Sequence, residues 1–151
     1  MVPDSPATDG GHRGELGAFR YQKGTISRSS FPLTAAGVAS MQGLGIYSDE
    51  KIRLGIDYLL RHLDGFNFRE GSQREGHYFF WYGHYYAVQA LYQAGGAEWE
   101  TYYGRTRRQI LSMQLPDGSF PNETGPGPAF GTAMALLILE IPYRLLPIFQ
   151  R

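Results

Sequence analysis

The chain contains no cysteine among its 151 residues. Without thiols it can form no disulfide, carry no thiolate nucleophile and build none of the zinc sites that include cysteine. The lack of cysteine does not show whether the protein works in an oxidising or a reducing compartment, because proteins of either compartment can lack disulfides.

Net charge and long apolar runs are missing as well. Fourteen basic side chains balance fourteen acidic ones, so no basic field is available to attract nucleic acid or other polyanions. The most apolar run, residues 133–139, is far shorter than the roughly 20 residues that a membrane-spanning helix requires. Residues 1–11 contain no apolar segment typical of a signal peptide. We therefore expect no nucleic-acid partner, no transmembrane segment and a cytoplasmic location.

Glycine and aromatic residues, by contrast, are abundant. The chain has 20 glycines, and aromatic residues make up 15% of it. This combination is typical of large flat side chains packed where helices meet tight turns. The length suits one domain with a real core. We predict a flexible or disordered N-terminus over residues 1–13 and a single domain over residues 14–151, either complete or the C-terminal fragment of a longer chain.

Hydrophobic periodicity predicts an all-α protein in which two kinds of helix alternate. Apolar helices are expected at 32–41, 77–94 and 129–140, and one-sided amphipathic helices at 48–63 and from the Gly95-Gly96 pair to about residue 113. Ser30 as N-cap and Pro32 at the first position mark the start of the first helix. The third helix has aromatic or aliphatic residues on every side, which predicts burial all round. The tail from Tyr143 to Arg151 keeps apolar residues and is expected to dock on the domain.

The alternation of helices is itself a repeat. Ala35, Gly83 and Gly131 are each 48 residues apart, and Ala39, Ala87 and Ala135 keep the same spacing. Thr34, Tyr82 and Phe130 follow this register at the helix starts. A single helical hairpin cannot bury its apolar helix, so stacked neighbours must supply the missing surface.

The segment Ser112-Met113-Gln114-Leu115-Pro116-Asp117-Gly118-Ser119-Phe120 resembles the QW-type motif of squalene cyclases and protein prenyltransferase β-subunits. In that motif a glutamine caps helix ends and an aromatic residue stacks beyond a glycine turn. The corresponding structural residues here are Gln114, Asp117, Gly118 and Phe120, with Phe120 in place of the usual tryptophan. The resemblance covers about residues 14–142. It implies an (α/α) toroid, of which about three helical hairpins, with five to six helices, would form roughly half a ring.

The catalytic motifs of that family are missing from this sequence. Squalene cyclases protonate a polyene with a DxDD element, but Asp49, Asp57, Asp64 and Asp117 stand apart here. A diphosphate-ionising DDxxD cluster is absent, and without cysteine the zinc site of the prenyltransferases cannot form. We therefore predict no metal site and no cofactor, and we assign no catalytic residue.

The resemblance implies a central cavity lined by the aromatic helix. The candidate lining residues are Tyr78, Trp81, Tyr82, His84, Tyr85 and Tyr86. Such rings can stabilise carbocations by cation–π contact, although core packing explains the same residues equally well. His77 and His84 share one face of this helix, but lie about 10 Å apart along its axis, too far for one metal ion.

Three hypotheses about function stay open from the sequence. The chain binds or converts a long apolar isoprenoid substrate in a cavity lined by the aromatic helices. Alternatively it is a non-catalytic helical-repeat scaffold for a protein or lipid partner. In a third hypothesis the ring is completed by a missing N-terminal half or by a second copy in a homo-oligomer.

Overall fold

The computed structural model describes residues 16–20, 30–68, 79–122 and 127–145. The described part is built from α-helices α1 (Phe31–Gly43), α2 (Glu50–His62), α3 (Phe80–Ala94), α4 (Gly96–Ser112) and α5 (Pro128–Glu140). Two short 3-10 helices, η2 (Leu63–Gly65) and η3 (Ile141–Tyr143), follow α2 and α5. The predicted all-α fold with five to six helices is confirmed. Within this described part no helix has the length and apolarity needed to cross a membrane.

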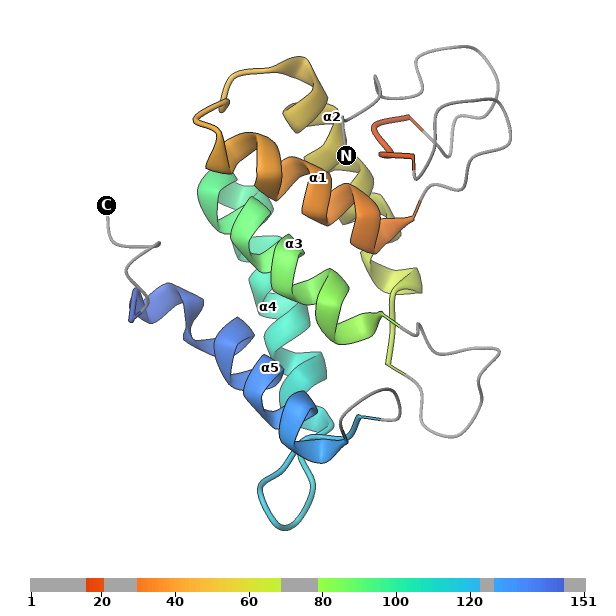
Figure 1. Cartoon of the computed structure of the whole chain (residues 1–151), viewed down its shortest axis with the longest axis vertical. Coiled ribbons are helices and arrows are strands. Elements are labelled where there is room, and N and C mark those ends of the chain that lie inside the picture. The colour runs from red at the N-terminus through yellow and green to blue at the C-terminus, as the bar shows by residue number, and fades with distance from the viewer. Residues whose placement is uncertain (1–15, 21–29, 69–78, 123–126, 146–151) are drawn as a thin grey trace.

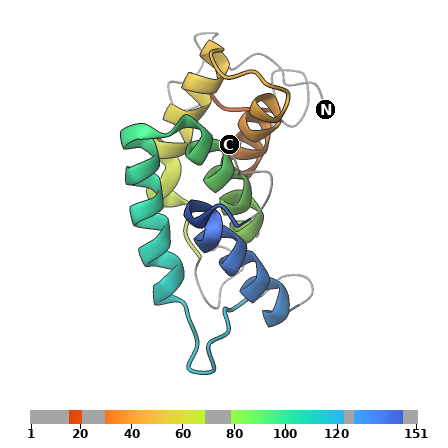
Figure 2. The same ribbon diagram turned by 90° about the vertical axis from the view of Figure 1, so that its left-hand side faces the viewer.

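The helices form two layers (Figures 1 and 2). Helices α1, α3 and α5 lie side by side in the front layer of Figure 1, and α2 and α4 lie behind them. Helix α3 is central, because it packs on α1 at one side, on α5 at the other and on α4 behind. The chain therefore forms two complete hairpins, α1–α2 and α3–α4, and α5 adds a third front-layer helix without a described α-helix behind it.

The helix boundaries follow from capping residues. The Ser30 hydroxyl accepts a hydrogen bond from the Leu33 amide at 3.4 Å, so Ser30 is the N-cap of α1 as predicted. Pro32 lies in the first turn of the helix. Helix α2 is predicted to begin at Ser48 but begins at Glu50, two residues later, because Asp49 is its N-cap and accepts a hydrogen bond from the Lys51 amide at 2.7 Å. Gly95, with φ of +72°, ends α3 as expected.

The prediction that the third helix is buried all round is wrong. Its buried residues are Phe80, Trp81, Gly83, His84, Ala87, Val88, Ala90 and Leu91. The opposite side is open: Tyr82 is 42% exposed, and Tyr85, Tyr86 and Gln89 are half-buried. The reason is geometric, since α1, α5 and α4 occupy three sides of α3 and no described helix covers the fourth.

The repeat is visible in the hydrogen bonds at the starts of the front-layer helices. The Phe19 amide donates to the Thr34 hydroxyl at 3.0 Å, and the Phe120 amide donates to the Thr132 hydroxyl at 3.0 Å. The two threonines are 132 − 34 = 98 residues apart, or two repeats of 49. By these bonds the counterpart of Thr34 is Thr132, not Phe130 as the 48-residue register suggested.

Two predictions about the chain ends concern residues outside the described ranges. Residues 1–13, expected to be flexible, are among them, as are residues 146–151 of the tail. The described beginning of the tail is open to solvent, since Tyr143 and Leu145 are both well exposed.

Candidate functional site

An open aromatic strip runs along the front of α3. Its rings are Phe79, just before the helix, and Tyr82 and Tyr86, at helical steps of three and four. The Phe79 and Tyr82 ring centroids are 6.1 Å apart and those of Tyr82 and Tyr86 are 4.9 Å apart, each pair edge to face. Tyr85 extends the strip sideways, with its ring centroid 5.1 Å from that of Tyr86. The strip thus presents a continuous surface of rings.

The Tyr82 phenol of the strip stays uncharged at neutral pH. Partial burial, and to a lesser extent the neighbouring Tyr86, raises the pKa of the Tyr82 hydroxyl above its usual value of 10.0. The phenol therefore offers a hydrogen-bond donor and acceptor and no anion. It is also too weak an acid to protonate a hydrocarbon double bond.

Helix α5 lies beside α3 at the edge of the same layer (Figure 1). Only Gly131, Ala135 and Ile138 of its thirteen residues are buried. Phe130 is 36% exposed and Leu136 is 48% exposed, although a soluble helix normally turns such side chains inward. We call Phe79, Tyr82 and Tyr86 of the strip, together with the exposed Phe130 in the first turn of α5, the open inner face. Leu136 lies about 120° from Phe130 around α5 and is not part of this face.

His84 and Trp81, two candidates for lining a cavity, lie in the core instead. His84 has no exposed surface, and its Nδ1 lies 2.8 Å from the Tyr102 hydroxyl. Desolvation lowers the pKa of His84 to about 3, so the ring is neutral. Trp81 is buried as well, and its Nε1–H donates to the Pro121 carbonyl at 3.1 Å.

The predicted set therefore divides in two. Tyr82, Tyr85 and Tyr86 share the open side of α3, whereas Trp81 and His84 face the opposite, buried side. Tyr78 and His77 lie outside the described residues. Phe79, an aromatic neighbour of this set in the sequence, shares one helical face with Tyr82 and Tyr86 at steps of three and four. Sequence reasoning missed Phe130 of α5 as a lining residue.

The QW-like segment forms a turn that is closed by its own hydrogen bonds. The Gln114 amide donates from Nε2 to the Gly118 carbonyl at 3.0 Å, and Asp117 accepts from the Ser119 amide and hydroxyl at 3.0 and 2.7 Å. The hydrogen bond from the Ser119 hydroxyl, and to a lesser extent that from the Ser119 amide, lowers the pKa of the Asp117 carboxyl. Gly118, with φ of +86°, supplies the turn.

Phe120 ties this turn to the core. It is buried, and its ring lies edge to face on Trp81 with centroids 6.3 Å apart. The exposed Gln114 amide serves its own turn, whereas the glutamine of the QW-type motif caps helix ends. This turn therefore has a structural role, because it sets where α5 starts. Its residues are Gln114, Asp117, Gly118 and Phe120.

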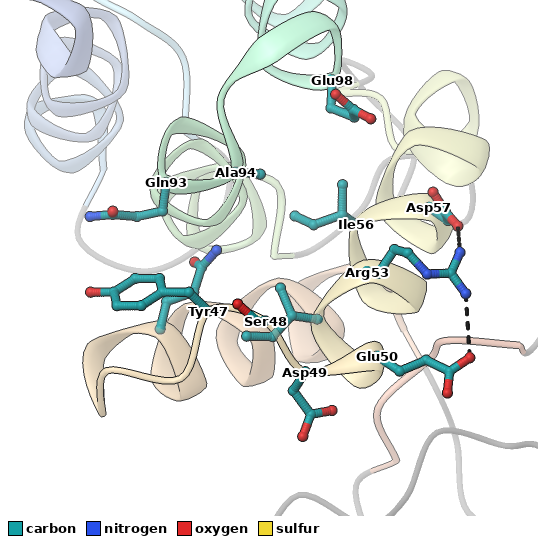
Figure 3. A pocket seen from close by; sticks show the side chains of 12 residues that line it. Tyr47, Ser48, Asp49, Glu50, Arg53, Ile56, Asp57, Gln93, Ala94 and Glu98 are labelled. Carbon is teal, nitrogen blue, oxygen red and sulfur yellow. Dashed lines mark hydrogen bonds and ion pairs between the residues drawn. The ribbon is translucent and has the colours of Figure 1, made fainter.

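A separate hollow of about 650 Å³ lies between the two hairpins, where α1 and α3 end and α2 and α4 begin (Figure 3). It is bounded by the end of α1, the loop before α2, the first turns of α2 and α4 and the end of α3. Its charged residues are Asp49, Glu50, Arg53, Asp57 and Glu98. Arg53 pairs with Glu50 at 3.4 Å and with Asp57 at 3.3 Å.

Neither region shows the donor set of a metal centre. In residues 16–20, 30–68, 79–122 and 127–145 no three His, Asp or Glu side chains come together as metal ligands. Comparison with protein-family models, with curated proteins and with solved structures finds no match for this chain. The inference about function therefore depends on the chemistry of the two surfaces themselves.

Proposed function

We propose that the domain binds the long apolar chain of an isoprenoid or lipid along the open inner face. The observation that carries the proposal is the strip of Phe79, Tyr82 and Tyr86 beside the largely uncovered α5. Contiguous exposed apolar surface is rare on soluble monomers and usually marks a binding site. Each CH₂ group removed from water contributes about 0.8 kcal/mol, so a long chain gains affinity from even shallow contact.

The chemistry of the face favours binding over conversion. Its four defining side chains all provide rings, two of which are phenols. Burial raises the pKa of Tyr82, which makes it a still weaker acid, and the carboxylates of the hollow lie on other elements. Rings of this kind favour apolar chains and, by cation–π contact, cationic groups.

A binding panel tests the proposal. We expect farnesol and squalene to bind saturably, and farnesol to bind about as tightly as farnesyl diphosphate, because none of the four side chains of the face is basic. Product analysis of the same mixtures, including geranylgeranyl diphosphate, should show no conversion. Turnover of any of these compounds would replace binding by catalysis as the function, and the absence of all binding would remove the proposal.

A matched pair of variants locates the site. Phe130→Ala on α5 removes a 36% exposed side chain of the open inner face, and Leu111→Ala on α4 removes a 42% exposed one from the back layer. We expect Phe130→Ala and Tyr82→Ala each to weaken farnesol binding about 3- to 30-fold, and Leu111→Ala to leave it unchanged. Equal effects of Phe130→Ala and Leu111→Ala would mean that the ligand adheres to exposed apolar residues in general.

A second candidate function is a scaffold role, in which another helix packs on α5. It is favoured by the burial of only three of the thirteen residues of α5, because the next helix of a continuing layer would cover its outer side. We expect light scattering of concentrated protein to show a species twice the 16.9 kDa chain mass, and Leu136→Glu to restore the monomer. Monomer at all concentrations would argue against self-association through α5.

A further inference from the structure

We propose that the hollow between the two hairpins binds a small organic polycation that carries N–H donors, such as a di- or polyamine. This site is separate from the open inner face, and it uses different residues. It rests on two independent observations, an excess of carboxylates and a buried amide oxygen without a donor.

The first observation is the charge of the lining. Four carboxylates, Asp49, Glu50, Asp57 and Glu98, face one guanidinium, that of Arg53. Asp49 serves as the N-cap of α2, and Arg53 bridges Glu50 and Asp57. Glu98 comes from α4, on the other side of the hollow from the α2 residues (Figure 3). The lining is thus negative in sum, and its carboxylates are distributed over two elements.

The second observation is Gln42, at the end of α1. This lining residue is only 4% exposed, and its Nε2 donates to the Ala90 carbonyl of α3 at 3.1 Å. Its Oε1 is buried and accepts no hydrogen bond from the residues that the structure describes. A buried amide oxygen without a donor costs free energy, and a ligand N–H that reached it would remove that cost.

The arrangement selects an organic cation and not a metal ion. In the part of the chain that the structure describes, the carboxylates do not converge on one point as metal ligands do. A flexible amine with several charges can instead satisfy separate carboxylates and an amide oxygen at once. A hollow of about 650 Å³ is within the range of small-ligand sites.

The test compares spermidine with its fully quaternised analogue, in which methyl groups replace every N–H, by calorimetric titration at constant ionic strength. Both are trications, but only spermidine has N–H donors. We expect spermidine to bind saturably and at least about tenfold more tightly than the analogue, the ratio that a charge-assisted hydrogen bond gives. Absence of saturable binding, equal affinity of the two, or full competition by magnesium chloride at matched ionic strength would overturn the proposal.

Two sets of variants assign the effect to the hollow. Glu98→Gln in the lining should weaken spermidine about tenfold, whereas Glu100→Gln, an exposed residue of the same helix outside the hollow, should not. Gln42→Met should reduce the preference for spermidine over its methylated analogue, because only the hydrogen bonds to the carboxylates remain. Equal weakening by Glu98→Gln and Glu100→Gln would show attraction by overall charge alone, which contradicts a built site.

Discussion

At the scale of single residues, the same helix treats two neighbouring polar rings in opposite ways. His84 is enclosed by aromatic rings, with the Phe80, Phe66 and Phe31 centroids 4.5, 5.2 and 5.7 Å from its own. Tyr82, two residues earlier, points to the open side. The buried ring loses its proton affinity, since its pKa falls to about 3, whereas the exposed phenol stays available to a ligand.

The pKa of His84 predicts how stability depends on pH. The folded value of about 3 lies below the unfolded value of about 6.5, so the unfolded state binds more protons between these limits. The contribution of His84 is complete above pH 6.5 and is lost as pH falls toward 3, with a slope of up to about 1.4 kcal/mol per pH unit. Urea unfolding from pH 4.5 to 7.5 measures it.

The variant His84→Phe isolates this residue from the carboxylates that titrate in the same range. The Tyr102 hydroxyl lies 3.3 Å from the His84 backbone carbonyl, so it keeps an acceptor when the imidazole is replaced. We expect the variant to lose stability less steeply than the parent as pH falls below 6.5. Parallel profiles for the two proteins would contradict a neutral, buried His84.

At the scale of elements, close packing between the two hairpins depends on glycine in α3. A Cβ added at Gly83 would lie 2.5 Å from Cζ of Phe66 and 3.2 Å from Cγ of Pro32. The Phe66 ring cannot move aside easily, because it stacks on Phe31 with centroids 4.2 Å apart. Helix α3 can therefore lie against α1 and the segment after α2 only without a side chain at this position.

Two glycine substitutions of opposite sign test this packing. Gly83→Ala should cost about 1–3 kcal/mol of unfolding free energy through overpacking. Gly104→Ala, on the exposed side of α4 with no atom within 4 Å of the added Cβ, should gain about 0.5–1 kcal/mol. Denaturant unfolding distinguishes them, and a harmless Gly83→Ala would mean that the hairpins pack less tightly than described.

The sequence predicts elements better than it predicts which sides of them are covered. Ser30, Pro32 and Gly95 act on local backbone, so they located helix ends to within about a residue. Trp81 and Tyr82 are adjacent aromatic residues with similar propensities, and only the number of neighbouring helices decides that one is buried and the other open. The buried Oε1 of Gln42 depends on contact with α3, 48 residues away, which no local pattern reports.

At the scale of the whole molecule, the two-layer arrangement leaves its front layer uncovered. In the described part of the chain, α2 and α4 shield one side of α1, α3 and α5, and nothing shields the other (Figure 2). The exposed rings of α3 and the exposed Phe130 of α5 belong to neighbouring helices of this layer. An apolar chain laid across them would remove both from water without any change of fold, which is the proposed function.

The most direct test follows individual tyrosine rings by NMR in protein with isotope-labelled tyrosine during a farnesol titration. We expect saturable shifts of the Tyr82 and Tyr86 ring signals. We expect no shift for Tyr47, which is exposed in the loop before α2, or for the buried Tyr102. Equal shifts at Tyr47 and Tyr82, or unmoved Tyr82 and Tyr86 signals when the ligand is bound, would contradict the open inner face as the binding site.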